Sequence, residues 1–222
     1  MLEGAVDTIM VGFEESRANY KHPDRVKVTG TPVRVDFLSQ SKAQAKRELG
    51  IPEDRPLVAS VWGSLGAAHM NEIMTDFIVR ACAKPFFNLI HSAGKAGYSR
   101  MKDALEREKP DYARLGMDVR DYIYDMPRVM AAADLVLCRA GASTLAELTA
   151  MGKPAILVPS PNVTNNHQER NARVLEAAGG AKVMLEQEFT ADSLLGLVSE
   201  LLQHPGQLEE MSRNMLKLAV PD

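Results

Sequence analysis

Short apolar runs alternate with amphipathic segments along most of this sequence. Apolar residues in the longer segments recur at helical spacing, which predicts helices between strands. The predicted strands cover residues 57–61, 86–90, 134–138, 155–158 and 181–185, whereas 118–123 is ambiguous. The predicted helices cover residues 42–49, 67–82, 99–108, a segment ending at 151, 165–178, 191–203 and 206–218.

This alternation predicts an α/β fold. Continuously apolar strands are typical of a Rossmann-like parallel sheet with helices on both faces. Such a sheet binds ligands at the carboxyl ends of its strands, close to a reversal in strand order. The loops that follow the strands are therefore the places to look for a site.

The first 35 residues do not follow this repeat. Residues 7–11 and 25–28 predict two short strands around a polar helix, and residues 30–34 read as a turn or linker. We expect residues 1–35 to be the tail of a preceding domain and residues 36–222 to form the main domain. The chain is expected to be a piece of a longer protein.

Composition narrows the functional classes. The net charge of −3 gives no electrostatic case for binding nucleic acid. Cys82 and Cys138 lie in apolar runs without metal-ligand spacing, and no apolar run approaches the roughly 18 residues of a membrane span. The first residues lack the features of a signal peptide, so a cytoplasmic location is expected.

Two glycine-containing loops, residues 62–66 and 139–147, each join a predicted strand to a helix. Glycine lets the backbone approach an anion, and the free N–H groups of a helix start favour phosphate. Ser64 adds a hydroxyl in the first loop, although that loop is equally explained as a turn that tightens packing. In the second, the amides of residues 142–144 would face a ligand and Glu147 would accept from a ribose diol.

The second loop also has an explanation without a ligand. Thr144 and Glu147 have the spacing of a capping box, which satisfies a helix start by itself. Two such loops after parallel strands would converge on one sheet edge, which favours binding.

A third loop, residues 159–169, is rich in side-chain amides and carries His167. These groups suit the hydroxyls of a sugar. The alternative is that Asn165 or Asn166 serves as a helix N-cap, but the unusual density of side-chain amides favours binding. The sequence contains no HExxH, GxSxG, P-loop or Asp-x-Asp motif.

Three strings together resemble the MurG family of bacterial glycosyltransferases. They are Cys-Arg-Ala-Gly-Ala-Ser-Thr-Leu-Ala-Glu at 138–147, Gly-Lys-Pro-Ala-Ile-Leu-Val-Pro-Ser-Pro at 152–161 and Asn-Asn-His-Gln-Glu-Arg-Asn-Ala at 165–172. The resemblance implies one half of a two-domain GT-B glycosyltransferase, the half that binds UDP-N-acetylglucosamine. It implies no cofactor and no metal, and it places the catalytic base and the membrane-docking surface in the other domain.

The resemblance also assigns residues. It implies that Arg34 contacts the nucleotide and that the backbone of Ile123 pairs with uracil. Ser64 would meet the pyrophosphate, together with the amides and hydroxyl of Ala142, Ser143 and Thr144. It further implies that Glu147 holds the ribose, and that His167 and Gln168 face the N-acetylglucosamine. Trp62 stands where the family has glycine, and a bulky ring there would narrow the phosphate loop.

The expected reaction of the full-length parent is transfer of N-acetylglucosamine to undecaprenyl-pyrophosphoryl-N-acetylmuramoyl-pentapeptide. The parent would act on the cytoplasmic face of the inner membrane, and this chain alone is expected to be inactive. Three alternatives remain: a stand-alone donor-binding subunit that needs a partner, a UDP-sugar epimerase, and a non-catalytic interaction domain.

Overall fold

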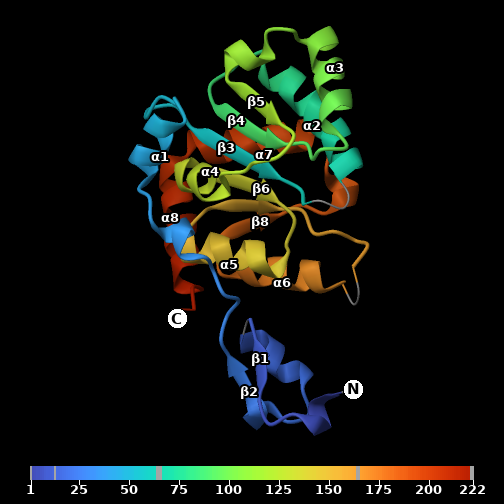
Figure 1. Ribbon diagram of the computed structural model, residues 1–222, viewed down its shortest axis with the longest axis vertical. Helices are drawn as coiled ribbons and strands as arrows, with labels where there is room; N and C mark the ends of the chain where they lie inside the picture. Colours follow the sequence, from blue (N-terminus) through green and yellow to red (C-terminus); the bar gives the residue numbers. More distant parts are fainter. Residues whose placement is uncertain (1, 13, 64–66, 164–165, 221–222) are drawn as a thin grey trace.

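The chain forms two parallel sheets (Figure 1). The computed structural model describes residues 2–12, 14–63, 67–163 and 166–220. The small sheet pairs β1 (Ile9–Val11) with β2 (Val26–Val28). The strands of the large sheet are β3 (Leu57–Val61), β4 (Asn88–Ser92), β5 (Met117–Arg120), β6 (Leu135–Cys138), β7 (Ala155–Leu157) and β8 (Ala181–Val183).

Helices fill most of the connections between these strands. The α-helices are α1 (Lys42–Glu48), α2 (Ala67–Ala81), α3 (Tyr98–Glu108), α4 (Met126–Ala132), α5 (Ala142–Met151), α6 (His167–Ala177), α7 (Ala191–Gln203) and α8 (Pro205–Lys217). The 3₁₀ helices are η1 (Leu2–Ala5), η2 (Glu14–Asn19), η3 (Pro23–Arg25), η4 (Val35–Leu38), η5 (Tyr112–Leu115) and η7 (Glu186–Glu188).

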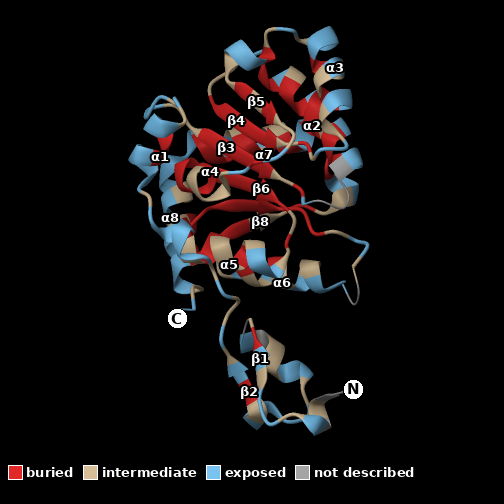
Figure 2. Ribbon diagram, in the orientation of Figure 1, coloured by how far each residue is buried: buried red, intermediate tan, exposed pale blue. Residues whose placement is uncertain are grey.

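Helices cover both faces of the large sheet, as predicted. Alternate strand residues divide between two cores: Val58 and Leu89 pack with α2, α3 and α7, while Ala59 and Ile90 pack with α1, α4, α5 and α6. Figure 2 shows the buried strands as a continuous layer between these helices. This confirms the Rossmann-like fold and explains why the strand runs are apolar without alternation.

The strand order of the large sheet, β5-β4-β3-β6-β7-β8, reverses direction once. The chain builds outward from β3 through β4 to β5, then returns and places β6 on the other side of β3. The loops after β3 and β6 therefore meet at the carboxyl edge, which is where this class of sheet binds ligands.

Asp134 fixes the pairing of β3 with β6 at the opposite, amino edge. The backbone N–H of Leu57 donates to Asp134 Oδ2 at 2.8 Å, and the N–H of Asp134 donates to Leu57 O at 2.8 Å. Buried Lys46 lies 3.0 Å from the same carboxylate, and Lys42 pairs with its other oxygen. Burial raises the pKa of Asp134, but hydrogen bonds from Lys42 and Leu57 outweigh it and the net pKa lies below 3.8.

Two predictions of local structure were wrong. The strand expected at 86–90 is β4 at 88–92, because the rings of Phe86 and Phe87 pack edge to face 5.1 Å apart ahead of the strand. The sequence reading also missed α4, a short helix with Pro127 in its first turn. The ambiguous segment 118–123 contains the end of β5 followed by a loop.

The small sheet lies apart from the large one and is joined to it by the segment 29–34 (Figure 1). Gly30 in this segment has φ +69°, and a Cβ there would lie 3.0 Å from Val220 Cβ near the other end of the chain. The assignment of residues 1–35 to a preceding domain stays a prediction.

We expect Asp134→Ala to lower the free energy of unfolding by about 3 kcal/mol, because it leaves the buried Lys46 ammonium without its carboxylate. Urea denaturation at pH 7 measures this. The contribution of Asp134 is complete above its unfolded pKa of 3.8 and is lost as the pH falls through the lower folded value. The difference in the free energy of unfolding between wild type and variant should therefore become smaller as the pH falls below 3.8.

Glu53→Ala is the control for this prediction, since Glu53 pairs with Arg47 on the surface with both side chains more than half exposed. Its effect should stay within about 0.5 kcal/mol. An equal loss in both variants would show that Asp134 is no more than a surface charge.

Candidate functional site

The first glycine loop begins where β3 ends, at the reversal in strand order. Gly63 has φ +76°, a conformation that favours glycine, and a Cβ there would meet nothing within 4 Å. Ser64 lies outside the described residues, so its expected contact with the pyrophosphate stays a prediction. The described part of the loop leaves open space beside the sheet edge.

Trp62 precedes the first glycine loop. Its ring is buried and packs edge to face on Phe189, with the ring centroids 5.2 Å apart. The ring therefore belongs to the core between the sheet and α7. Residues 64–66 of the loop lie outside the described residues, so the expected narrowing of the loop stays a prediction.

The second loop presents the start of α5 to the same edge. The N-cap is Gly141, with φ −72° and ψ 143°, and glycine has no side chain with which to cap a helix. The capping-box interpretation of Thr144 and Glu147 is wrong, because the helix begins at Ala142 and Thr144 is already its third residue. The first-turn N–H groups of Ala142, Ser143 and Thr144 are thus left for an anion, with the positive end of the helix dipole behind them.

Glu147 lies one turn further along α5 and is brought near Arg34, which is more than one hundred residues earlier in the chain. Burial raises the pKa of the Glu147 carboxyl, the Arg34 guanidinium lowers it and the Asp36 carboxylate raises it. Arg34 pairs with Asp36 at 3.2 Å and lies over the Phe37 ring, 5.2 Å from its centroid. Arg34 and Glu147, which are both predicted to contact the nucleotide, therefore lie close enough for the charge of one to affect the pKa of the other.

Phe37 is the anchor of this arrangement. It is 3% exposed and belongs to the same core cluster as Ile123 in the loop after β5. The Ile123 side chain is buried, as expected for an apolar residue, so any contact with a ligand must come from its backbone. Burying Phe37 sets η4 against α4 and α5 and so places Arg34 at the edge of the site.

The third loop is tied to the helix that follows it. Gln168 Oε1 accepts a hydrogen bond from Ser160 N at 2.9 Å, which links α6 to the start of the loop. His167 is the first residue of α6. Asn166 does occupy the N-cap position, but its φ is +51° and its side chain donates to Glu169 Oε2 at 2.6 Å instead of capping the helix.

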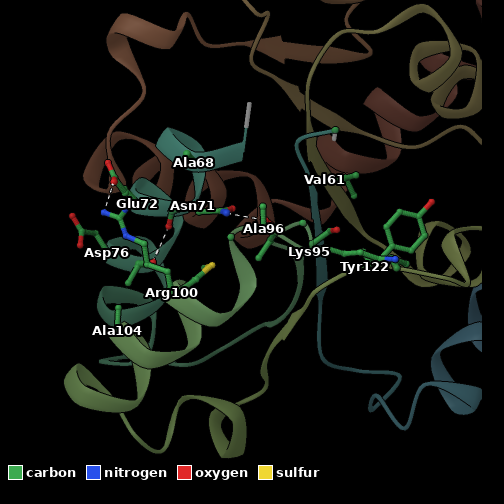
Figure 3. A pocket seen from close by; sticks show the side chains of 18 of the residues that line it. Val61, Ala68, Asn71, Glu72, Asp76, Lys95, Ala96, Arg100, Ala104 and Tyr122 are labelled. Atoms are coloured by element: carbon green, nitrogen blue, oxygen red, sulfur yellow. Dashed lines mark hydrogen bonds and ion pairs between the residues drawn. The ribbon is translucent and has the colours of Figure 1, made fainter. Parts of the chain in front are cut away.

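A cavity of about 1070 Å³ opens along the carboxyl ends of β3, β4 and β5 (Figure 3). Ile123 and Gly63 line it, whereas Arg34, Glu147 and the start of α5 do not. Lys95 and Tyr122 also line it, and Figure 3 shows the Lys95 side chain extending toward Tyr122. The cavity continues between α2 and α3, past the exposed ion pair of Glu72 with Arg100 at 2.9 Å.

Sequence reasoning missed Lys95 and Tyr122. The sequence does carry a signal for Lys95, because Gly94 and Gly97 flank it. A strand predicted at 86–90 leaves a gap before these glycines, whereas the observed strand ends at residue 92 and the segment 93–97 follows it directly. Tyr122 is half exposed and carried no motif of its own.

The sequence signature of the glycosyltransferase family 28 C-terminal domain matches residues 58–222. The chain belongs to glycosyltransferase family 28. This membership covers the large sheet and every predicted site residue except Arg34.

Relatives and solved structures agree with this family. The chain is 40% identical over 221 residues to UDP-N-acetylglucosamine–N-acetylmuramyl-(pentapeptide) pyrophosphoryl-undecaprenol N-acetylglucosamine transferase of Acetivibrio thermocellus, covering 99% of this chain and 58% of that protein. The fold resembles Acinetobacter baumannii MurG, with TM-score 0.72, 23% identity and coverage of 99% and 58% of the two chains. It also resembles a putative UDP-N-acetylglucosamine 2-epimerase from Listeria monocytogenes, with TM-score 0.69, 13% identity and coverage of 96% and 55%.

The family 28 chain described here thus spans about 58% of the length of that curated relative. The architecture is that of one half of a GT-B glycosyltransferase, as expected. In the described ranges, no three His, Cys, Asp or Glu side chains come together in a way that would hold a metal ion. Among the same residues, no helix is long and apolar enough to cross a bilayer.

Beneath the cavity of this family 28 domain lies a fully buried histidine. His91 Nδ1 is 2.9 Å from Ser60 Oγ, and Nε2 is 3.1 Å from Asn71 Oδ1. Asn71 Nδ2 donates to Ala93 O at 2.8 Å, so its Oδ1 must accept and His91 must carry its proton on Nε2. The network joins β3, β4 and α2 without a charge, and burial lowers the pKa of His91 to about 3.

This burial predicts a specific pH dependence of stability. The folded pKa of about 3 lies below the ordinary value of 6.5, so the contribution is complete above pH 6.5 and is lost progressively as the pH falls toward 3. Between pH 7 and pH 5, wild type should lose about 2 kcal/mol through His91 alone. Urea denaturation of wild type and His91→Gln at both pH values measures this, and the variant should lack that loss.

Thr149→Val is the matched control, because it alters another buried polar side chain that does not titrate. It should lower stability by the same amount at both pH values. A pH dependence of His91→Gln equal to that of wild type would disprove the neutral, buried histidine.

Proposed function

We propose that this chain binds UDP-N-acetylglucosamine at the carboxyl edge of its large sheet. The observation that carries the proposal is the uncapped start of α5 beside Gly63 at the reversal in strand order, with Glu147 and Arg34 next to it. Backbone N–H groups suit a diphosphate, and a carboxylate one turn into the helix suits a ribose diol. The name of the relative from Acetivibrio thermocellus supplies the identity of the sugar.

Each predicted residue has a proposed role in that complex. Ser64 and the start of α5, at Ala142, Ser143 and Thr144, hold the pyrophosphate. Glu147 holds the ribose hydroxyls, Arg34 approaches the nucleotide from the linker, and the backbone of Ile123 pairs with uracil. His167 and Gln168 face the N-acetylglucosamine.

The proposed reaction of the whole protein is transfer of N-acetylglucosamine to undecaprenyl-pyrophosphoryl-N-acetylmuramoyl-pentapeptide with inversion. A hydroxyl oxygen of the acceptor attacks the anomeric carbon, the bond from that carbon to the diphosphate oxygen breaks, and UDP departs. The hydroxyl proton passes to a base outside the residues of this chain. The N–H groups and dipole of α5 stabilise the charge that develops on the departing diphosphate.

The same proposal covers location and partners. The lipid-linked acceptor and the peripheral membrane contact belong to the part of the protein that precedes this domain. The whole protein then acts at the cytoplasmic face of the bacterial inner membrane, and this chain supplies the donor half.

Calorimetric titration of the chain with UDP-N-acetylglucosamine, UDP-glucose and ADP-glucose tests the donor. We expect selective binding of UDP-N-acetylglucosamine. Absence of binding would refute the proposed donor site, and conversion of the sugar to N-acetylmannosamine would identify an epimerase instead.

Glu147→Ala should weaken UDP binding by about 1–3 kcal/mol, because the ribose loses a charged hydrogen-bond acceptor. Titration with UDP measures the loss. Glu200→Gln is the control, because Glu200 is an exposed residue of α7 and has no proposed role in the site. The UDP affinity of this variant should equal that of wild type. Unchanged UDP affinity in Glu147→Ala would remove Glu147 from the site.

A further inference from the structure

Arg139 joins three segments that follow three neighbouring strands. It comes directly after β6, and its Nη1 donates to Val158 O at 3.1 Å and to Pro159 O at 3.2 Å, where the chain leaves β7. The same nitrogen lies 2.7 Å from Glu186 Oε2 on η7, which follows β8. The arginine side chain is 15% exposed and the glutamate 23%, so the contact is largely shielded from water.

These contacts hold the beginning of the third loop. Val158 precedes the loop and Pro159 is its first residue, and the next residue, Ser160, donates its N–H to Gln168 Oε1 at 2.9 Å. Arg139 therefore anchors the loop on the strand side and Gln168 anchors it on the helix side. These contacts hold the backbone at residues 158–160. They therefore also determine the position of the start of α6, which carries His167 and Gln168.

We infer that Arg139 and Glu186 are positioning residues for recognition of the sugar, an inference that rests on the proposed function. Arg139 lies two residues before Gly141, so one side chain connects the diphosphate-facing start of α5 with the sugar-facing loop. Neither residue needs to touch the ligand. The ion pair sets the distance between the two subsites and so determines which hexose fits between them.

A guanidinium is suited to this task because one of its nitrogens, Nη1, reaches all three oxygen acceptors. One partly buried arginine donates to two backbone carbonyls at a strand end, and Glu186 neutralises its charge. The uridine contacts lie elsewhere, at Glu147 and at the loop of Ile123. Losing Arg139 should therefore affect the sugar and spare the nucleotide.

The test compares three ligands on the full chain: UDP, UDP-glucose and UDP-N-acetylglucosamine, by calorimetric titration. Arg139→Met keeps an apolar side chain of similar length but removes every donor. We expect the preference for UDP-N-acetylglucosamine over UDP-glucose to fall about tenfold, while UDP affinity changes less than about threefold. Glu186→Ala leaves the two carbonyl contacts in place and should reduce the preference by about threefold.

Two further variants separate positioning from a purely structural role. Arg139→Lys retains a cation with three donors and should keep most of the preference. Arg80→Met removes another arginine–carboxylate contact between elements, to Asp192 at 2.9 Å, and should leave the preference at the wild-type value. If Arg139→Met does not fold, Glu186→Ala and Arg139→Lys carry the test.

An unchanged preference in folded Arg139→Met and Glu186→Ala would overturn the inference and leave the donor site standing. Equally weaker binding of all three ligands, UDP included, would also overturn the inference, because that result indicates a general structural defect. Failure of the wild-type chain to bind UDP-N-acetylglucosamine would overturn the proposed function itself and this inference with it.

Discussion

The site depends on one buried contact at the opposite edge of the sheet. Asp134 and Leu57 exchange two hydrogen bonds, and Lys42 and Lys46 each pair with one oxygen of the Asp134 carboxylate. This contact fixes the register of β3 against β6. These two strands are neighbours in the large sheet although they are not consecutive in the sequence. Because parallel strands share their direction, a register fixed at the amino edge also fixes which loop residues meet at the carboxyl edge.

Around that fixed pair, the site is assembled from segments with separate tasks. The start of α5 offers N–H groups, the linker brings Arg34 toward Glu147, and the ion pair of Arg139 with Glu186 holds the third loop. The start of α5 and Glu147 share one helix, and Arg139 lies two residues before the glycine at which that helix begins. The uncharged network of His91 lies beneath the cavity that Gly63 and Ile123 line, and it joins β3, β4 and α2 there.

Sequence patterns predicted the parallel sheet and the glycine loops, because apolar runs and glycines act locally. They misplaced β4, since Phe86 and Phe87 are apolar to fill the core and not to form a strand. The capping box failed for a similar reason: Thr144 and Glu147 have the right spacing, but the helix starts earlier, at a glycine. The approach of Arg34 to Glu147 and of Arg139 to Glu186 arises from tertiary packing, which no spacing along the chain encodes.

Trp62 is the only tryptophan in the sequence, and it stands at the junction between the core and the first glycine loop. Its buried indole, set against Phe189, will emit at the short wavelengths typical of an apolar surrounding. All tryptophan fluorescence of the protein therefore comes from a single point, one residue away from Gly63. The protein therefore carries its own fluorescent probe beside this loop.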